Sequence, residues 1–374
     1  MADTQKPRLI IFELRMLGDA VMSLPFIRNA LTKYEVFVCC QPGAKEIFTT
    51  MLPADHLISW LPPWLAETGK YKLSRWRHSG IKKLVTELRS LKPDIAISVW
   101  ADTRVHILMA LSNAPVRIGF PMNKRNYLAY ERRWRKKQLY GGKLLNIAAH
   151  LAMLKPLLTR KINRADYWEH RIEDWHQLAN ELKLPWNLET PWIKPDLSIN
   201  KAHDEQFNKF LNAAISTEKK IWLLHPGARL PLRRWPVEKF QKLIDTIFTP
   251  MNIPLIVVKP PDSPAPDVRA SNQILIETPD IPDLIYVLSN ADNIICNDSL
   301  ISHLGAGLGK KVITIFGPGC QQWCAPYNNE EFVVDADVCP HKPCMDRCEM
   351  PSYVCMEAVT VKMVQDVISR VISG

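Results

Sequence analysis

An alternation of strand-like and helix-like stretches occurs twice along the chain, and it restricts the fold more than any other feature. Short runs of apolar and β-branched residues begin near residues 8, 35, 56, 95 and 116, with amphipathic stretches between them. The alternation restarts after residue 215, with the runs IWLLHPG, IPLIVVK, QILIE, NIICND and KVITIFG. Strands that alternate with helices form parallel sheets. The sequence therefore predicts an α/β protein with two parallel-sheet domains.

The limits of these domains follow from length and proline content. A chain of 374 residues is long enough for two domains of ordinary size. The stretch LPWNLETPWIKPDLS contains three prolines that oppose helix continuation, which places the boundary between 184 and 200. We expect domains at residues 1–190 and 191–355. Residues 356–374 form an amphipathic helix that could pack on either domain.

Composition indicates a folded protein of the cytoplasm. With 47% hydrophobic and 23% charged residues, the chain has enough apolar material for a core and is not expected to be disordered. No run reaches the roughly 18 apolar residues that a membrane span needs, and the apolar stretch near the N-terminus is too short for a signal peptide. Nine cysteines in such a protein are expected to be thiols or metal ligands and not disulfides.

Charge is distributed unevenly between the two halves. Residues 1–200 have a net charge of +13 and residues 201–374 one of −3. The densest basic stretch is 123–143, with eight Lys or Arg residues and one Glu. A basic half attracts nucleic acid, an anionic membrane surface or a phosphorylated ligand, and charge alone does not choose among them.

Asp19 is the first candidate for chemistry. It follows the first predicted strand, and ligands of open α/β sheets bind at the carboxyl ends of strands. We interpret Asp19 as a general base. The alternative is that its carboxylate only caps the following helix. No Gly-x-Gly-x-x-Gly motif is present here, so a nicotinamide site is not expected.

A second candidate block runs from His225 to Pro236, after the first strand of the second domain. Gly227 permits a close backbone approach, and nearby arginines, Arg229 and Arg233 among them, could bind a diphosphate by charge-assisted hydrogen bonds. The alternative for the arginines is a solvated basic loop. Trp235 is expected to be a core residue.

A third block contains Asn297, Asp298, Ser299 and His303 at a strand-to-helix junction. Five of the 14 glycines follow between residues 305 and 319. The N–H groups at a helix start form an anion site. The alternative is that these residues only cap the helix and that His303 is an ordinary helix histidine.

A fourth block consists of Cys339, Cys344, Cys348 and Cys355. Thiolates at short spacing suit a structural zinc or iron ion, but no Cys-x-x-Cys pair occurs. Packed free thiols are the interpretation that we prefer.

Taken in order, the blocks at 17–25, 226–236, 297–303 and 316–318 resemble glycosyltransferase family 9, the bacterial heptosyltransferases that use ADP-heptose. The resemblance implies a GT-B fold, with two Rossmann-like parallel-sheet domains facing across a cleft. In that arrangement the N-terminal domain binds the acceptor and the C-terminal domain the nucleotide sugar. It leaves open whether the C-terminal helix crosses back to the first domain.

The resemblance also implies roles for individual residues. Asp19 matches the catalytic base, and Arg233 lies where a lysine commonly contacts the donor phosphates. The donor-binding aspartate, hydroxyl and histidine match Asp298, Ser299 and His303. Two departures stand out: Leu300 replaces the usual glycine after the hydroxyl residue, and 259–262 reads Lys-Pro-Pro-Asp where a glycine-rich turn and an acidic residue are usual.

The implied reaction is metal-independent, inverting transfer of heptose to an acceptor hydroxyl, with lipopolysaccharide inner core as the expected acceptor. An anionic glycolipid at the cytoplasmic face of the inner membrane would suit the basic half, and we assign acceptor contacts to Lys124, Arg125, Arg132 and Arg133. Alternatives are a transferase of another nucleotide sugar, an autotransporter-type protein heptosyltransferase and a catalytically silent nucleotide-sugar-binding protein. A nucleic-acid partner is the interpretation that we do not favour.

Overall fold

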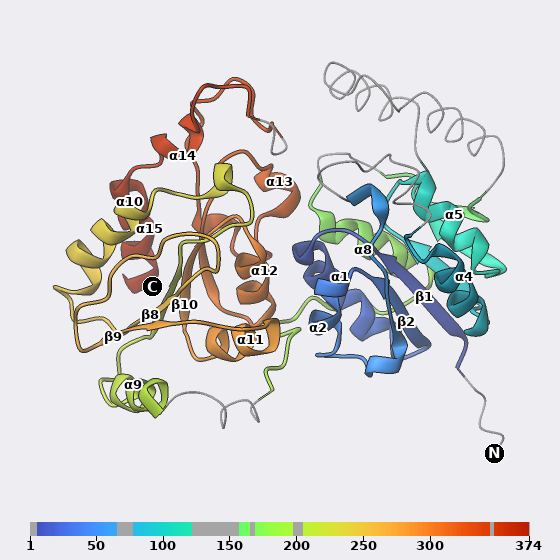
Figure 1. Ribbon diagram of the computed structural model, residues 1–374, viewed down its shortest axis with the longest axis horizontal. Helices are drawn as coiled ribbons and strands as arrows, with labels where there is room; N and C mark the ends of the chain where they lie inside the picture. The colour runs from blue at the N-terminus through green and yellow to red at the C-terminus, as the bar shows by residue number, and fades with distance from the viewer. Residues whose placement is uncertain are drawn as a thin grey trace. The chain divides into compact units, whose positions relative to one another are not determined.

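The computed structural model describes residues 6–65, 78–121, 157–164, 169–196, 205–344 and 348–373. The chain divides into two compact units: the first is Met1–Tyr167 with Ile172–Asn187, and the second is Trp168–Arg171 with Leu188–Gly374. Each unit contains a six-stranded sheet covered by helices (Figure 1). The predicted α/β class with two parallel sheets is therefore confirmed.

The first sheet has the strand order β3-β2-β1-β4-β5-β6, with every pairing parallel. Its strands are β1 (Arg8–Glu13), β2 (Glu35–Cys40), β3 (Leu57–Ser59), β4 (Ile95–Ser98), β5 (Val116–Gly119) and β6 (Arg160–Lys161). The helices of this part of the chain are α1 (Leu17–Ala30), α2 (Lys45–Phe48), α4 (Ile81–Ser90), α5 (Thr103–Leu111) and α8 (Arg171–Glu181).

The second sheet has the order β12-β11-β10-β7-β8-β9 and is also parallel throughout. Its strands are β7 (Trp222–His225), β8 (Leu255–Val258), β9 (Gln273–Ile276), β10 (Asn293–Asn297), β11 (Lys311–Ile315) and β12 (Val333–Val334). The helices are α9 (Glu205–Ile215), α10 (Val237–Leu243), α11 (Ile281–Ser289), α12 (Leu300–Gly307), α13 (Gln321–Cys324), α14 (Val354–Ala358) and α15 (Val361–Ser373). A π-helical turn, Ile244–Phe248, continues α10.

Both sheets follow the same doubly wound order, which reverses direction between β1 and β4 in the first unit and between β7 and β10 in the second. Ligands of such sheets bind outside the carboxyl ends of the strands at this reversal. The segments after these four strands are therefore the places to look for a ligand site in each unit. Asp19 follows β1, and the blocks around Arg233 and Asp298 follow β7 and β10.

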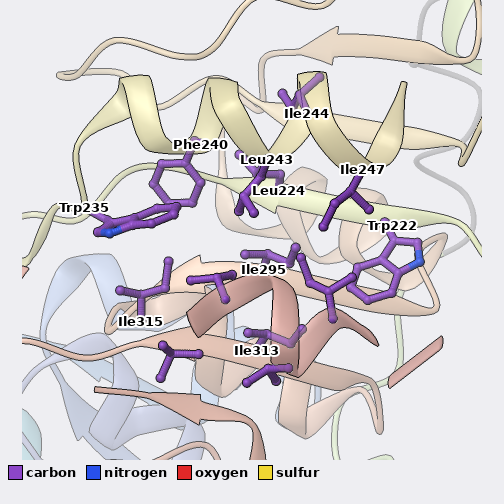
Figure 2. Packing of buried hydrophobic residues seen from close by; sticks show 14 of the residues in the cluster. Trp222, Leu224, Trp235, Phe240, Leu243, Ile244, Ile247, Ile295, Ile313 and Ile315 are labelled. Carbon is purple, nitrogen blue, oxygen red and sulfur yellow. The ribbon is translucent and has the colours of Figure 1, made fainter. Parts of the chain in front are cut away.

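The core of the second unit is formed by apolar side chains from strands and helices on one side of the sheet. Trp235 and Phe240 pack edge to face, with ring centroids 4.8 Å apart, beside Leu243, Ile295 and Ile315 (Figure 2). Helix α15 adds its apolar face to this cluster and contacts α10 and β11. The C-terminal helix thus packs on the second unit, which answers the question that the sequence left open.

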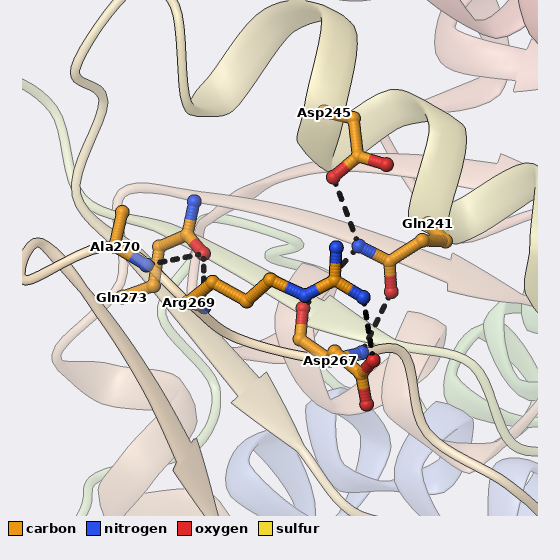
Figure 3. A network of polar contacts seen from close by, with 6 residues as sticks. All are labelled: Gln241, Asp245, Asp267, Arg269, Ala270 and Gln273. Atoms are coloured by element: carbon orange, nitrogen blue, oxygen red, sulfur yellow. Dashed lines mark hydrogen bonds and ion pairs between the residues drawn. The ribbon is translucent and has the colours of Figure 1, made fainter.

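Hydrogen bonds attach the loop between β8 and β9 to the end of α10 (Figure 3). Gln241 accepts a hydrogen bond from the Asp267 backbone N–H at 2.7 Å and donates to Asp245 at 3.0 Å. Arg269 forms an ion pair with Asp267 at 2.8 Å, and Gln273 accepts from the Arg269 N–H at 3.2 Å. The loop is therefore attached both to α10, through Gln241, and to the start of β9, through Gln273.

All ten predicted strands are present, whereas β6 and β12, of two residues each, were not predicted. Among the residues that the structure describes, no helix has the length and apolar character needed to cross a membrane.

Candidate active site

Asp19 lies in the first turn of α1, directly after the loop that leaves β1. Its Oδ2 accepts a hydrogen bond from the Met16 backbone N–H at 3.1 Å, and the residue is partly exposed. The capping role is therefore real. It does not exclude base chemistry, because the helix start keeps the carboxylate in one place beside solvent.

Glu13, the last residue of β1, is a second carboxyl group that sequence reasoning missed. It is 1% exposed, and both of its oxygens accept from Trp100 Nε1–H at 3.1 Å. Burial raises the pKa of Glu13 to about 8, and the charge of Asp19 raises it as well. At neutral pH this group is therefore mostly a neutral acid. The only sequence sign of it is an acidic residue at the end of an apolar run.

Trp100 and Arg15 complete this end of the first sheet. Trp100 follows β4, and the Arg15 guanidinium carbon lies 3.9 Å from the centroid of its ring, which is a cation–π contact. The Arg15 backbone N–H donates to Glu13 Oε1 at 3.0 Å. One buried acid therefore positions both the indole and the loop that carries the arginine.

Asp102 and Arg104 form a neighbouring pair at the start of α5. Asp102 caps the helix, and Arg104 binds it through Nε at 2.9 Å and Nη2 at 2.6 Å. Burial would raise the pKa of Asp102, but the hydrogen bonds and charge of Arg104 lower it below its ordinary value. This carboxylate is therefore ionised and already neutralised.

In the second unit, the loop after β7 approaches the rest of the site closely. A Cβ at Gly227 would lie 2.6 Å from Pro260 Cβ and 2.8 Å from His225 Cε1, so only glycine fits. Trp235 is buried in the core, as predicted, and its N–H donates to Asn297 Oδ1 at 3.0 Å. Asn297 Nδ2 donates back to the Pro226 carbonyl at 2.6 Å. Asn297 therefore connects the loop after β7 to the end of β10.

Arg233 and Asp298 meet at this junction. Arg233 Nη1 lies 3.0 Å from Asp298 Oδ2, with side-chain exposures of 26% and 3%. Gly319 lies against the same carboxylate, because a Cβ there would be 2.5 Å from Asp298 Oδ2. The structure thus brings together two of the predicted donor-binding residues. It also explains the glycine at position 319, because any larger residue there would collide with the Asp298 carboxylate.

Ser299 is the N-cap residue of α12, but it does not cap. Its side chain forms no capping hydrogen bond, and the buried Oγ has no hydrogen-bond partner among the described residues. One turn later, the pKa of His303 is lowered to about 3, mainly by burial and also by the charges of His170 and Arg233. His303 is therefore neutral and lies within the electrostatic reach of Arg233.

His170 and Arg171 are further residues near this site that sequence reasoning missed. His170 Nε2 donates to the Ala325 carbonyl at 2.8 Å, and the Arg171 guanidinium lies 4.6 Å from the Trp323 ring centroid. They come from a segment more than 100 residues before α12, so spacing along the chain gave no sign of them.

The remaining donor-side residues have clear positions. Arg229 is exposed on the loop after β7, and Leu300 is the first residue of α12. Lys259 forms an ion pair with Glu277 at 2.6 Å, while the Asp262 carbonyl accepts from Arg234 at 3.1 Å. Arg234 therefore holds the loop after β8, whereas Arg233 pairs with Asp298 at the helix start.

Cys339, Cys344, Cys348 and Cys355 line one pocket. In the described part of the chain, however, no three His, Cys, Asp or Glu side chains converge as metal ligands. The Cys348 thiol lies 3.7 Å from the carbonyls of Met350 and Ser352, and burial raises the pKa of Cys355. The raised pKa favours the protonated thiol of Cys355, and the structure gives the zinc or iron interpretation no support. The acceptor residues Lys124, Arg125, Arg132 and Arg133 lie outside the described residues.

Comparison with solved structures identifies the fold class. A glycosyltransferase family 9 protein from Veillonella parvula matches with a TM-score of 0.66 and 14% identity, over 99% of this chain and 98% of its own. The E. coli heptosyltransferase WaaC with ADP matches with a TM-score of 0.61 and 16% identity, over 97% and 99% of the two chains. The fold is therefore the GT-B fold of these glycosyltransferases.

Sequence comparison identifies the family. The model of glycosyltransferase family 9 (heptosyltransferase) matches residues 146–354, and the chain belongs to this family. Lipooligosaccharide heptosyltransferase 2 of Haemophilus influenzae is 23% identical over 187 residues, which are 46% of this chain. That match spans about half, 54%, of the length of this curated relative.

Proposed function

We propose that this protein transfers a heptose from ADP-heptose to a hydroxyl group of an acidic lipopolysaccharide inner-core acceptor. Family membership supports a heptosyltransferase, and the E. coli relative was solved with ADP. Residues 1–190 would bind the acceptor and residues 191–355 the donor. We place the reaction at the cytoplasmic face of the inner membrane, because the basic half suits an anionic glycolipid.

The observation that carries the donor assignment is the arrangement at the start of α12. Arg233 is paired with the buried Asp298, and the adjacent Ser299 Oγ is buried with no hydrogen-bond partner in the part of the chain that the structure describes. A buried hydroxyl of this kind needs a hydrogen-bond partner, and a phosphate or sugar oxygen would supply it. Arg233 remains partly exposed, so a diphosphate can reach its guanidinium.

The mechanism is a direct displacement at the anomeric carbon. Asp19 accepts the proton of the acceptor hydroxyl as the new C–O bond forms, and the bond between that carbon and the phosphate oxygen breaks. ADP leaves with the electron pair, and Arg233 and the N–H groups of α12 stabilise its charge. One displacement inverts the configuration. These fixed charges would do the work that a divalent metal does in other transferases.

The test is transfer with purified protein, ADP-heptose and inner-core acceptors of increasing length. The expected result is release of ADP together with a mass increase of one heptose on one acceptor. Parallel assays with other nucleotide sugars identify the donor. Oligonucleotide binding measured at several salt concentrations tests the nucleic-acid alternative. Binding of ADP-heptose without turnover on any acceptor would instead support a silent binding protein. That outcome would draw attention to Leu300, where the family commonly has glycine.

Asp19→Asn should lower transfer at least about 100-fold, because a positioned general base contributes 10²–10⁴. ADP affinity and the melting temperature should change little, since an asparagine can still accept the Met16 N–H. Single-turnover kinetics and calorimetry measure the two effects. Near-normal turnover in this variant would leave Asp19 as a helix cap only.

A further inference from the structure

A buried acid at the end of β1 fixes two groups beside the proposed base. Glu13 accepts from the Trp100 indole N–H through both oxygens and from the Arg15 backbone N–H through one. Arg15 and Asp19 both act electrostatically on Glu13, so the cation and the proposed base both lie near this buried carboxyl group.

Trp100 is held by its backbone as well as by its ring. Its N–H donates to Ser98 Oγ at 3.2 Å, and His106 Nε2 donates to its carbonyl at 3.1 Å. Ser98 in turn donates to the Phe12 carbonyl at 3.1 Å, across the reversal between β1 and β4. The indole therefore has one orientation, and a group stacked on it is positioned before any ligand arrives.

The Arg15 side chain is exposed, and its guanidinium carbon lies 3.9 Å from the Trp100 ring centroid. With respect to the described residues, that guanidinium forms no hydrogen bond and no ion pair. Stacking covers one face of the planar group and leaves its N–H donors at the edge. An arginine in this state can bind two oxygens of one anion.

Two of the carboxyl groups near Arg15, those of Glu13 and Asp102, do not need its charge. Burial raises the pKa of Glu13 to about 8, so this group is mostly neutral at pH 7. Asp102 is paired with Arg104 through two hydrogen bonds, at 2.9 and 2.6 Å. The positive charge of Arg15 therefore exceeds what these two acids require.

We propose that Arg15 binds an oxyanion of the acceptor, a carboxylate or a phosphate, and so holds an adjacent hydroxyl at Asp19. Glu13 and Trp100 are positioning residues for this contact. The proposal rests on the proposed function, because it takes the molecule at Asp19 to be an acceptor sugar. It adds a specific residue and a ligand chemistry inside the described part of the first unit, separate from the basic stretch at 123–143.

The first measurement is direct binding, which does not depend on turnover. Calorimetry compares three acceptor glycosides, with a carboxylate, with a phosphate and with neither, on the wild type and on Arg15→Ala. We expect Arg15→Ala to weaken binding of one charged glycoside about 10- to 100-fold and to leave the neutral one unchanged. Which charged glycoside responds identifies the anion. Lys82→Ala removes one exposed charge from α4 and serves as the matched control.

The second measurement is steady-state transfer. Arg15→Ala should raise the acceptor KM by the same factor and leave donor KM and ADP affinity unchanged, and Arg15→Lys should recover part of the loss. Trp100→Phe keeps an aromatic face but loses the bond to Glu13, so it should give an intermediate acceptor KM. Equal losses for charged and neutral acceptors, or none, would overturn the proposal. Wild-type binding of a charged glycoside without heptose transfer would count against the proposed function and leave the anion site standing.

Discussion

Burial favours the neutral form of two histidines and one glutamate in this chain. Burial lowers the pKa of His225 to about 4 and that of His303 to about 3, so both are neutral. Burial raises the pKa of Glu13 to about 8. The two histidines lower the stability of the folded protein as the pH falls below 6.5, because the unfolded chain then binds protons that the buried imidazoles do not bind. The glutamate has the opposite effect.

For Glu13 the folded protein binds the proton more tightly than the unfolded chain, whose pKa is near 4.5. Its stabilising contribution is complete below 4.5 and is lost as the pH rises through about 8. Glu13→Gln should therefore flatten the fall in unfolding free energy over this window, by at most about 1.4 kcal/mol per pH unit. Thermal melting from pH 5 to 8 measures the slope. Glu87→Gln, at an exposed glutamate on α4, should keep the wild-type slope, and an unchanged slope in Glu13→Gln would show that Glu13 is ionised throughout.

Residue patterns selected some residues of the candidate site and missed others for a physical reason. Asp19, Arg233 and Asp298 each lie within eight residues of the end of an apolar strand, so local sequence was enough to select them. The contact of Glu13 with Trp100 joins residues 87 positions apart, and it exists because β1 and β4 are neighbours in the sheet. Nothing in the spacing of these two residues indicates that pairing.

At the scale of elements, strand prediction succeeded where burial gives a continuous apolar run. β1, β2 and β10 are buried along nearly their whole length, and their sequences are correspondingly apolar along most of each strand. β6 is an exposed Arg160–Lys161 pair, and β12 is a pair of valines. Two residues give no periodicity, so only the sheet partner defines such edge strands.

The start of α12 depends on a glycine outside that helix. A methyl group at Gly319 would lie 2.5 Å from Asp298 Oδ2, so Gly319→Ala must displace this carboxylate from Arg233. We expect ADP affinity to fall at least about 10-fold, in line with the loss of one charge-assisted contact. Calorimetric titration with ADP measures the change. Gly43→Ala is the matched control, because its Cβ would meet Leu17 Cδ2 at an ordinary 3.6 Å. Unchanged ADP affinity in Gly319→Ala would separate Asp298 from the donor site.

The cysteine pocket before α14 and α15 should be structural and free of metal. We expect protein purified without chelator to contain no stoichiometric zinc or iron, and Cys344→Ser to retain transfer with a modest loss of melting temperature. Elemental analysis and a transfer assay on both proteins measure this. A stoichiometric metal in the wild type that is absent from Cys344→Ser would reverse the assignment. In that case we would expect the variant to lose folding as well, because metal binding and folding are coupled.

At the scale of the whole molecule, the two units share a strand order but differ in charge. Both sheets reverse at the same place in their topology, and each unit has its own hydrophobic core. Residues 1–200 have a net charge of +13 and residues 201–374 one of −3. The shared fold therefore does not explain why the two units would bind different substrates. The charges and loops that each unit adds to its sheet would determine the ligand, as is usual for functional sites on a common architecture.

This charge difference predicts separate salt responses for the two substrates. An acidic acceptor is attracted by the field of the first unit, so its KM should rise with ionic strength, whereas the donor KM should change little because Arg233 and Asp298 are already paired at short range.

Replacing Lys124, Arg125, Arg132 and Arg133 together by glutamine removes four charges from the densest basic stretch. In this variant the acceptor KM at low salt should rise several-fold and its salt dependence should flatten, while the donor KM stays constant. Kinetics from 20 to 500 mM salt, at saturating levels of the other substrate, measure both constants. An acceptor KM that remains as salt-sensitive as in the wild type would move the steering charge away from 123–143 and toward residues such as Arg15 beside Asp19.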